Sequence, residues 1–364
     1  MNQGTLNQGT LNPGTLNPET RMDYRQSGVD IDAGNETVRR IKSLARGTFT
    51  PGVLSEIGSF GGLFQVPPDA TAPVLVASAD GVGTKLKLAF MSGRHDTVGQ
   101  DLVNHCVNDI LVQGATPLFF LDYLATGRLQ PSVAEQIVGG MAKACGENGC
   151  ALLGGETAEM PGFYADGEYD LAGFIVGMVE RDRLIDGKTI VPGDVLIGVP
   201  STGLHTNGYS LARRVVFEGL GLTFDSHVAE LGTSIGAALL VPHRSYLKTV
   251  QPLLPRRLVK GMAHITGGGI TENLPRVFPE GTAARIARDS WIVPPLFTFL
   301  QQGGQVSDDE MLRAFNMGVG MIVICRESDS DSVLDTLAAA GEHQAWRLGT
   351  IVSGSREVRY RGKA

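Results

Sequence analysis

The amino-acid sequence predicts an α+β protein built from two α/β domains with mixed sheets. Its 364 residues exceed the usual size of a single domain, so two domains are expected. Strand-like and helix-like segments are mixed in both halves without strict alternation, which does not fit a doubly wound fold. A segment containing Gly and Pro ends at Asp194, where an apolar strand begins. We therefore predict an N-terminal domain over 23–180 and a C-terminal domain over 181–364.

The first 22 residues differ from both predicted domains. They begin with a repeated pentad, NQGTL, NQGTL, NPGTL, which is polar and rich in Gly and Pro. Such a repeat cannot bury enough apolar surface to offset the entropy of an ordered chain. We predict that residues 1–22 form a disordered tail, and we assign it no function.

Hydrophobic periodicity defines the expected elements. A helix at 96–114 is indicated by apolar residues four apart, at Val98, Leu102, Cys106 and Ile110. The other elements expected in the first domain are a helix at 35–46 capped by Asn35, strands at 73–78 and 117–125, a helix at 131–148, and strands at 150–153 and 170–180. The second domain repeats this coarse order, with a strand at 195–199, a helix after Asn207, a helix start at 266–270, a strand at 318–325, a helix at 328–340, and strands at about 344–352 and 356–360.

Composition restricts the partners. With 38 acidic and 31 basic residues the net charge is −7, which argues against nucleic acid or an anionic membrane as the main partner. The chain has no apolar span of about 18 residues and no signal-peptide core, so we expect a cytoplasmic protein that does not enter a membrane. The four cysteines form no CxxC pair and are expected to be buried thiols in a reducing cytosol.

The segment SADGVGTK, residues 78–85, follows an expected strand. It lacks the register of a Walker A loop and is not a GxGxxG turn. It does place Asp80 at a strand end, with Gly81 and Gly83 allowing a turn before Lys85. This arrangement suits Mg²⁺ on Asp80, with phosphate bound by backbone N–H groups and Lys85. A plain turn with a surface lysine fits the eight residues equally well.

Acidic side chains recur in two further segments. Asp101, His105 and Asp109 are four apart, so they share one helix face opposite the apolar stripe. That face is either solvated or, if Asp109 converges with Asp80, part of a Mg²⁺ site. In GGETAEMPG, Glu156 and a second glutamate three residues later could bind metal or a substrate amine, or could begin a helix, where acids meet the helix dipole favourably.

Three loops rich in glycine or polar residues complete the candidate site. Residues 58–64, GSFGGLF, are either a lid over a nucleotide or an ordinary loop. Residues 264–270, HITGGGI, precede an expected helix whose free N–H groups would attract an anion. Residues 201–210, STGLHTNGYS, form either a helix cap or a polar substrate wall. No Ser-His-Asp or Cys-His set is evident, so the expected chemistry is phosphoryl transfer by positioning and charge neutralisation.

Taken together, these motifs resemble a known family. The segments YRQSGVDIDAGNETVRRIK, GSFGGLF, SADGVGTKLKLA, VNDILVQGA, GGETAEMPG, STGLHTNGYSLAR, HITGGGITENLPR and NMGVGM occur here in the order typical of phosphoribosylformylglycinamidine cyclo-ligases, also called aminoimidazole ribonucleotide synthetases. The resemblance extends from about Asp23 to about Ser353. Each motif alone is weak, but eight in register are specific.

The resemblance implies an activity and an assembly. Members convert formylglycinamidine ribonucleotide and ATP, with Mg²⁺, into aminoimidazole ribonucleotide, ADP and phosphate in purine biosynthesis. Transfer of phosphate to the formamide oxygen precedes intramolecular attack by the amidine nitrogen, which gains from proximity. The family has two α/β domains without a Walker loop, and forms a homodimer whose N-terminal sheets build a barrel-like core with active sites near the interface.

The resemblance also suggests residue roles. Asp80 and Asp109 are expected to hold Mg²⁺, Lys85 to contact the ATP phosphates, and Glu156 to orient metal or substrate. The remaining expected contacts are Gly61 and Gly62 in the lid, Gly81, Gly83 and Thr84 at ATP, and His205, Asn207, Thr266, Gly267, Gly268 and Gly269 at the substrate.

Related ATP-using families are less consistent with this sequence. Selenophosphate synthetases carry a reactive Cys or selenocysteine near the N-terminus, whereas the first cysteine here is Cys106, within an expected helix. Hydrogenase-maturation relatives end in a cysteine, and this sequence ends RGKA. Thiamine-phosphate kinases lack the full GGETAEMPG and HTNGYSLAR combination. The remaining alternative is a protein that binds a nucleotide without catalysing a reaction. The complete set of acidic residues argues against this alternative.

Overall fold

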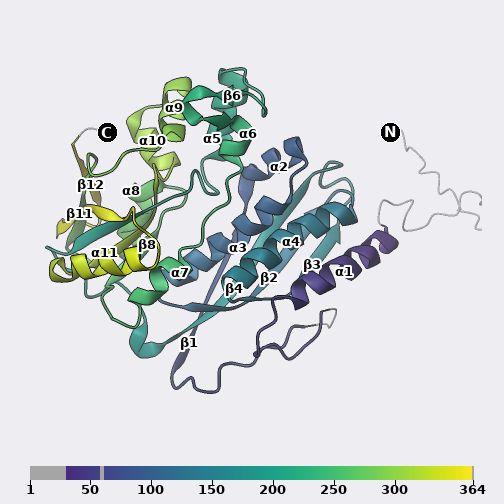
Figure 1. Cartoon of the computed structure of the whole chain (residues 1–364), viewed down its shortest axis with the longest axis horizontal. Coiled ribbons are helices and arrows are strands. Elements are labelled where there is room, and N and C mark those ends of the chain that lie inside the picture. Colours follow the sequence, from purple (N-terminus) through teal and green to yellow (C-terminus); the bar gives the residue numbers. More distant parts are fainter. Residues whose placement is uncertain (1–29, 58–60, 363–364) are drawn as a thin grey trace, which may run out of the picture.

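The computed structural model describes residues 30–57 and 61–362. The predicted tail at 1–22 and the first three residues of the expected glycine lid lie outside the described residues. Within them, two mixed sheets carry the fold, as the sequence predicts. Helices α1 (Ile31–Arg46), α3 (Asp96–Leu111) and α4 (Pro131–Glu147) lie along the first sheet, and the later helices surround the second sheet (Figure 1).

The first sheet has four strands in the order β1-β4-β2-β3. Its strands are β1 (Pro73–Gly81), β2 (Thr116–Thr126), β3 (Ala151–Glu159) and β4 (Tyr169–Glu180). Strand β4 pairs antiparallel with β1 and β2, whereas β3 runs parallel to β2. Helices pack on one face of this sheet: α1 (Ile31–Arg46), α3 (Asp96–Leu111) and α4 (Pro131–Glu147), while α2 (Leu86–Ser92) follows β1 through the short 3₁₀ turn η2 (Gly83–Lys85).

Helix α3 buries the apolar stripe that the sequence predicts. Val98, Leu102, Cys106 and Ile110 are all fully buried. The helix also approaches α4 closely through glycine, because a Cβ atom at Gly140 would lie 2.0 Å from the backbone oxygen of the first residue of α3. This close approach fixes the position of α3, whose opposite face carries the candidate site.

The other face of the first sheet carries exposed apolar side chains that no part of residues 30–57 or 61–362 covers. Leu75 of β1 is 60% exposed and Phe174 of β4 is 46% exposed. Side chains alternate across a strand, so these two residues lie on the face opposite the helices. A soluble domain seldom leaves such a face open, and contiguous apolar patches commonly mark interaction surfaces.

The second sheet has six strands in the order β12-β9-β11-β5-β10-β8. Its strands are β5 (Val195–Pro200), β8 (Gly261–His264), β9 (Thr282–Ala287), β10 (Val319–Cys325), β11 (Trp346–Ser353) and β12 (Val358–Arg361). All neighbours pair antiparallel except β12 with β9, and the pair β6 (His227–Val228) and β7 (Thr233–Ser234) forms a separate small hairpin. The surrounding helices are α5 (Tyr209–Arg213), α6 (Ile235–Leu239), α7 (Leu247–Val250), α8 (Gly269–Asn273), α9 (Pro295–Gly304), α10 (Asp308–Ala314) and α11 (Ser330–Ala339).

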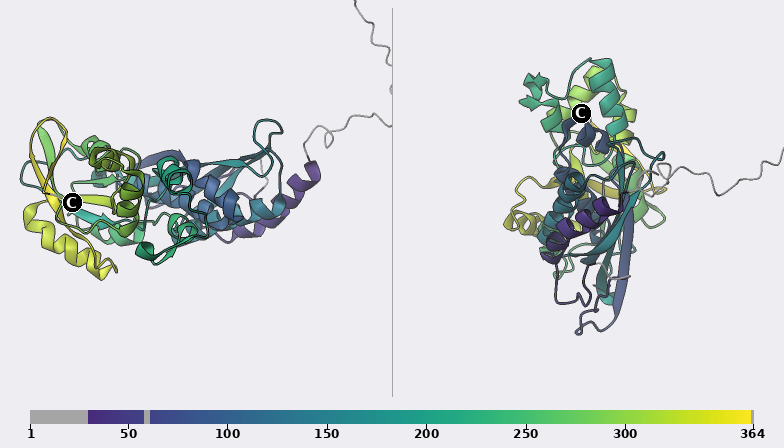
Figure 2. Two further views of the ribbon diagram at one scale, coloured as in Figure 1. Left: turned by 90° about the horizontal axis from the view of Figure 1, so that it is seen from above. Right: turned by 90° about the vertical axis from the view of Figure 1, so that its right-hand side faces the viewer.

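The two sheets lie towards opposite ends of an elongated molecule. Seen from above, α1 extends to one end and the second sheet with α11 occupies the other (Figure 2). The first sheet uses residues 73–180 and the second uses 195–361, and the proposed division at 180/181 falls in the connection between them. No helix in the described part of the chain combines the length and the apolar character needed to cross a membrane.

Several local expectations differ from the structure. The first helix is capped by Asp30, whose side chain accepts two backbone N–H groups, so the expected cap at Asn35 is wrong. Strand β1 continues to Gly81, which places Asp80 within the strand rather than beyond it. Glu156 lies on strand β3, and the alternative of a helix start there is wrong. The four cysteines are unpaired and buried, as expected.

Candidate active site

The polar face of α3 binds a loop of the C-terminal half. Asp101 accepts the backbone N–H of His243 at 2.6 Å, and Asn104 donates to the His243 carbonyl at 2.7 Å. Asn108 forms two further hydrogen bonds with the backbone of residues 244–246. All three side chains are buried. The alternative of a solvated helix face is therefore wrong, because this face holds the loop that carries His243.

Lys85 is part of the same buried connection. Its ammonium donates to Asp101 at 2.8 Å and to the carbonyls of Val241 at 2.8 Å and His205 at 3.3 Å. Neither Lys85 nor Asp101 has exposed side-chain surface. Burial lowers the pKa of Lys85 and raises that of Asp101, while their mutual attraction opposes both shifts. In this arrangement three oxygen acceptors of the protein surround the lysine ammonium, and the expected contact with the ATP phosphates stays a prediction.

Asp80 and Asp109 converge on buried histidines. His105 Nε2 lies 2.6 Å from Asp80 Oδ2 and 3.8 Å from Asp109 Oδ2, so one imidazole lies between the two acids. Asp109 also accepts from His264 Nδ1 at 2.8 Å and from the Ser78 hydroxyl at 3.0 Å. Because β1 supplies Asp80 and α3 supplies Asp109, the packing of α3 on the sheet determines their separation.

The histidines keep both acids ionised. Burial raises the pKa of Asp80, but the hydrogen bond and charge of His105 outweigh burial and leave this pKa below its usual value. Burial likewise raises the pKa of Asp109, and the hydrogen bond from His264 with the nearby positive charge brings it below the usual value. Burial lowers the pKa of His105, but Asp80 and Asp109 raise it overall. Two partly exposed carboxylates are thus available to a cation.

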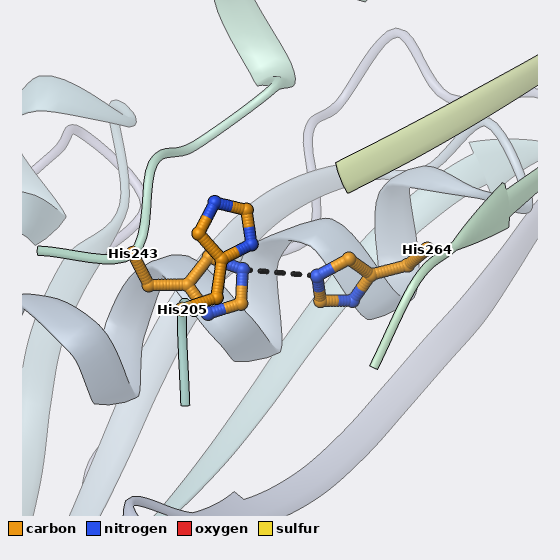
Figure 3. A group of neighbouring side chains, drawn as sticks. All are labelled: His205, His243 and His264. Carbon is orange, nitrogen blue, oxygen red and sulfur yellow. Dashed lines mark hydrogen bonds between the residues drawn. The ribbon is translucent and has the colours of Figure 1, made fainter. Parts of the chain in front are cut away.

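Two further buried histidines, His205 and His243, lie next to His264. His243 Nε2 lies 3.0 Å from His264 Nε2, and the His205 ring stacks on the His243 ring with centroids 3.9 Å apart (Figure 3). Thr206 Oγ1 lies 2.7 Å from His105 Nδ1 and 3.4 Å from His243 Nδ1. Burial lowers the pKa of His205 and that of His243 well below the usual value, so both imidazoles are neutral at pH 7.

A cavity of about 400 Å³ opens beside Asp109, between the two sheets. Asp109, His264 and Thr266 contribute to its wall, together with Arg276. Arg276 donates to Asn273 at 3.1 Å and has no carboxylate partner among the described residues. An exposed guanidinium without an acidic partner, in the same wall as the Asp109 carboxylate, suits a ligand that carries both an anion and a bound cation.

The predicted glycine loop lies partly at this cavity. Asn207 Oδ1 would be 3.2 Å from a Cβ atom at Gly267, so the structure brings these two predicted residues together. The N–H of Gly269 donates to the Thr266 carbonyl at 3.0 Å and is not free for a phosphate. Gly269 has φ +60°, and a Cβ there would lie 2.0 Å from a backbone oxygen, so this glycine is required by packing. Gly268 also has positive φ, at +93°.

The turn that follows Asp80 is exposed to solvent, whereas the side chain of Lys85 is buried. Gly83, with φ +67°, and Thr84 are both exposed at the start of η2. The N–H of Gly81 donates back to Asp80 Oδ1 at 2.7 Å, which orients the carboxylate. Thr84 lies 2.9 Å from the Ser210 hydroxyl, so the turn also contacts the C-terminal half.

Glu156 lies far from Asp80 within one chain. Asp80 pairs with Gly173, which pairs with Asp122, which pairs with Gly155 on β3. Three strand spacings separate the two edges of the sheet, or about 14 Å. Glu156 borders a different cavity, of about 650 Å³, together with Gly61 and Gly62. The structure therefore brings together Asp80 and Asp109 but not Glu156.

Sequence reasoning missed four side chains of this site. No role was assigned to His243, His264, Thr206 or Arg276, although three of them lie inside quoted motifs. Each is an isolated polar residue in a segment without helical or strand periodicity. Only the contacts across the two halves reveal them, so no local signal was available.

Comparisons with known proteins determine the family. Residues 64–179 match the AIR synthase related protein N-terminal domain, and residues 191–361 match the corresponding C-terminal domain. A phosphoribosylformylglycinamidine cyclo-ligase of Trichlorobacter lovleyi is 55% identical over 337 residues, covering 92% of this chain and 96% of the relative. The chain belongs to the phosphoribosylformylglycinamidine cyclo-ligase family. A cyclo-ligase of Desulfitobacterium hafniense is 56% identical over 338 residues, covering 93% of this chain and 98% of the relative.

Solved structures share the fold of this cyclo-ligase family member. Thiamine-monophosphate kinase from Stenotrophomonas maltophilia K279a superposes with a TM-score of 0.64 at 19% identity, covering 90% of this chain and 96% of that one. E. coli HypE superposes with a TM-score of 0.63 at 16% identity, covering 89% and 93%. At such identities the likeness establishes the two-sheet architecture and nothing more specific.

Proposed function

We propose that this chain closes the imidazole ring of formylglycinamidine ribonucleotide with ATP, releasing aminoimidazole ribonucleotide, ADP and phosphate. Membership in the cyclo-ligase family over 92% of the chain supports this reaction. The structural observation that carries it is the acid pair, of which Asp109 lines the 400 Å³ cavity; the same wall holds the Arg276 guanidinium, which has no carboxylate partner among the described residues. HypE, which shares the fold with a TM-score of 0.61, has been solved in complex with ATP, which supports ATP as the co-substrate.

Asp80 and Asp109 fit a Mg²⁺ ion. Both are ionised, partly exposed oxygen donors, and Mg²⁺ is usually bound by one or two carboxylates together with substrate phosphates. When bound, the ion would supply charge neutralisation for the transferred phosphoryl group. The exposed turn at Gly83 and Thr84 lies at the end of the strand that carries Asp80, so its backbone is suitable for the ATP phosphates.

The chain mainly binds and orients the substrate. In the proposed reaction the γ-phosphoryl group moves to the formamide oxygen; the amidine nitrogen then attacks that carbon, and the C–O bond breaks as phosphate leaves with the oxygen. The nitrogen loses its proton to solvent. Arg276 and Thr266 would hold the ribose phosphate, and Asn207 would contact the substrate beside Gly267. Because the attack is intramolecular, fixing the substrate conformation supplies much of the acceleration.

Lys85 has a positioning role in this proposal. Its ammonium connects α3 to the carbonyls of Val241 and His205, and so holds the loops of the C-terminal half against the acid pair. His205 would then act as a neutral, buried ring that stacks on His243, and not as a charged contact to the substrate.

A homodimer would complete the site. The uncovered apolar face with Leu75 and Phe174 supports the pairing of two N-terminal sheets into a barrel-like core. Glu156 and the glycines of the lid lie at the far edge of the sheet from Asp80, so a second copy could bring its own β3 edge to the acid pair. Unpaired thiols throughout the described chain agree with a proposed location in the cytoplasm.

The decisive experiment is a product assay. Purified protein is incubated with ATP, Mg²⁺ and formylglycinamidine ribonucleotide, and both ADP and the aminoimidazole product are measured. We expect one imidazole for each ADP, and Asp80→Asn to reduce turnover by at least about 100-fold, since it removes a metal carboxylate. ADP release without imidazole would contradict the cyclisation, and near wild-type turnover of Asp80→Asn at saturating Mg²⁺ would contradict the metal assignment.

A further inference from the structure

The acid pair is flanked by imidazole nitrogens as well as by oxygens. His105 Nε2 approaches Asp80 to 2.6 Å and Asp109 to 3.8 Å, and His264 Nδ1 approaches Asp109 to 2.8 Å. One donor atom each from His105, Asp109 and His264 lies within 4.8 Å of the others. Tetrahedral zinc with bonds of about 2.0–2.1 Å places its ligand atoms roughly 3.3 Å apart. Small side-chain movements would therefore create a two-histidine, two-carboxylate shell.

The outer contacts of both histidines suit metal binding. His105 Nδ1 lies 2.7 Å from the Thr206 hydroxyl, and His264 Nε2 lies 3.0 Å from His243 Nε2. A neutral imidazole that gives one nitrogen to a metal carries its proton on the other, which then needs an acceptor. Both rings have such an acceptor on the side away from the acids. Thr206 and His243 thus fix the rings of His105 and His264 in the orientation that a metal ligand requires.

The neighbouring group of His205, His243 and His264 is a poorer candidate. The rings of His205 and His243 are stacked, with 18° between their planes, so their in-plane lone pairs run side by side instead of converging (Figure 3). His205 Nε2 accepts the N–H of Thr202 at 3.2 Å, and the proton of the neutral ring is therefore on Nδ1. That nitrogen is a donor and not a ligand.

We propose that His105, His264, Asp80 and Asp109 bind a four-coordinate transition-metal ion such as Zn²⁺, which excludes Mg²⁺ and inhibits the enzyme. Mg²⁺ requires oxygen ligands in octahedral geometry, whereas imidazole favours zinc, cobalt and nickel. The same two carboxylates cannot serve both ions, so the two metals compete. Binding is independent of the proposed function, and only the inhibition rests on it.

Co²⁺ spectroscopy tests the ligand set directly. The full chain is titrated with Co²⁺ without ATP or substrate, and the visible absorption is recorded. Tetrahedral coordination gives an intense visible band and octahedral coordination a weak one. We expect the intense band in the wild type, its loss on addition of Zn²⁺, and its persistence in moderate excess of Mg²⁺. A weak octahedral spectrum in the wild type would overturn the proposal, whatever the behaviour of any variant.

Variants test which histidines contribute. His105→Gln and His264→Gln should each weaken Co²⁺ and Zn²⁺ binding by about tenfold or more. His343→Gln removes an exposed imidazole outside the cluster and should leave binding unchanged. Circular dichroism identifies variants that do not fold, and the wild-type spectrum remains decisive in that case. Unchanged Zn²⁺ affinity in both folded cluster variants would overturn the proposal.

Inhibition is measured separately in the product assay. Zn²⁺ should inhibit the wild type at concentrations that saturate the Co²⁺ site, and only a large excess of Mg²⁺ should restore turnover. Zn²⁺ that binds without affecting turnover would overturn the regulatory part. If the protein makes no imidazole under any condition, the proposed function fails while the spectroscopic result still decides the metal site.

Discussion

The ammonium of Lys85 donates to the carboxylate of Asp101 across 2.8 Å, and neither side chain has exposed surface. The pair joins the turn after β1 to α3, and Asp101 in turn accepts the backbone N–H of His243. A buried charge that loses its partner is left without solvation, which is more costly than the loss of a surface ion pair. Lys85 therefore helps to hold the turn after β1, helix α3 and the loop with His243 together.

Lys85→Met should lower the free energy of unfolding by about 3–5 kcal/mol, because it leaves Asp101 as an uncompensated buried charge. Lys87→Met is the matched control: Lys87 is 41% exposed and pairs with Glu168 on the surface, where ion pairs contribute about 0–1 kcal/mol. Urea unfolding of both variants measures the difference. Adding Asp101→Asn to Lys85→Met should recover part of the loss. If Lys85→Met unfolds like the wild type but has a greatly raised KM for ATP, the phosphate contact first expected from the sequence is correct.

The contact of α3 with α4 provides a second prediction. A methyl group at Gly140 would lie 2.0 Å from the Asp96 carbonyl, whereas at Gly139 it would meet only a Leu44 methyl at 3.9 Å. Gly140→Ala should therefore destabilise the protein by about 1–3 kcal/mol through overpacking. Gly139→Ala should be neutral or stabilising by up to about 1 kcal/mol, because alanine is the better helix former.

Thermal unfolding and the product assay should separate these two variants. Displacement of α3 would also move the carboxylate of Asp109, so Gly140→Ala should lose turnover while Gly139→Ala keeps it. Equal stability of the two alanine variants would show that the helices can move apart without cost.

Asp122 predicts a dependence of stability on pH. Burial raises the pKa of its carboxyl to about 7, above the value in an unfolded chain. Below about pH 4 both states hold the proton, and between about pH 4 and 7 only the folded state does, so stability falls as pH rises through this window. Above pH 7 the folded protein bears the full free-energy cost of a buried, ionised carboxylate. Asp122→Asn removes this cost.

We therefore expect Asp122→Asn to be more stable than the wild type at pH 8, by about 1–3 kcal/mol, with the difference vanishing near pH 4. Asp166→Asn, at an exposed position, is the matched control and should show no such trend. Melting temperatures at intervals of about half a pH unit suffice. A difference between Asp122→Asn and the wild type that does not vary with pH would contradict the assignment.

The sequence predicts those features that depend on local patterns. The apolar stripe of α3 and the apolar segments of β1 and β4 are visible in the sequence, and these elements were found with small shifts at their ends. Asp80 lies on β1 and Asp109 on α3, and their pairing was expected from the resemblance to the cyclo-ligases rather than from either pattern alone. The elements missed, including β8, β9 and α10, are short and are held mainly by contacts with the rest of the second domain.

Burial of charge could not be predicted from the sequence. Lys85 has the residue type and spacing of a phosphate ligand, and only the loops near Val241 and His205, more than a hundred residues away, make it an internal ion pair. The polar face of α3 is misleading for the same reason, because its partners are backbone groups of a distant loop. Local patterns specify which residues share a face but not what covers that face.

Subunit complementation tests how the site is completed. Asp80→Asn and Glu156→Gln should each be nearly inactive in the product assay. Within one chain Glu156 lies about 14 Å from Asp80 across the sheet, so we expect each active site to combine Asp80 of one copy with Glu156 of the other. After unfolding and refolding of an equal mixture, half of the dimers are mixed, and each mixed dimer holds one fully native site. Activity should therefore return to about a quarter of the wild-type value.

Sites formed within single chains would leave every site in the mixture defective, and no recovery would be seen. Refolding each variant alone controls for activation by the treatment, and sedimentation of the wild type establishes that the copies pair under the assay conditions.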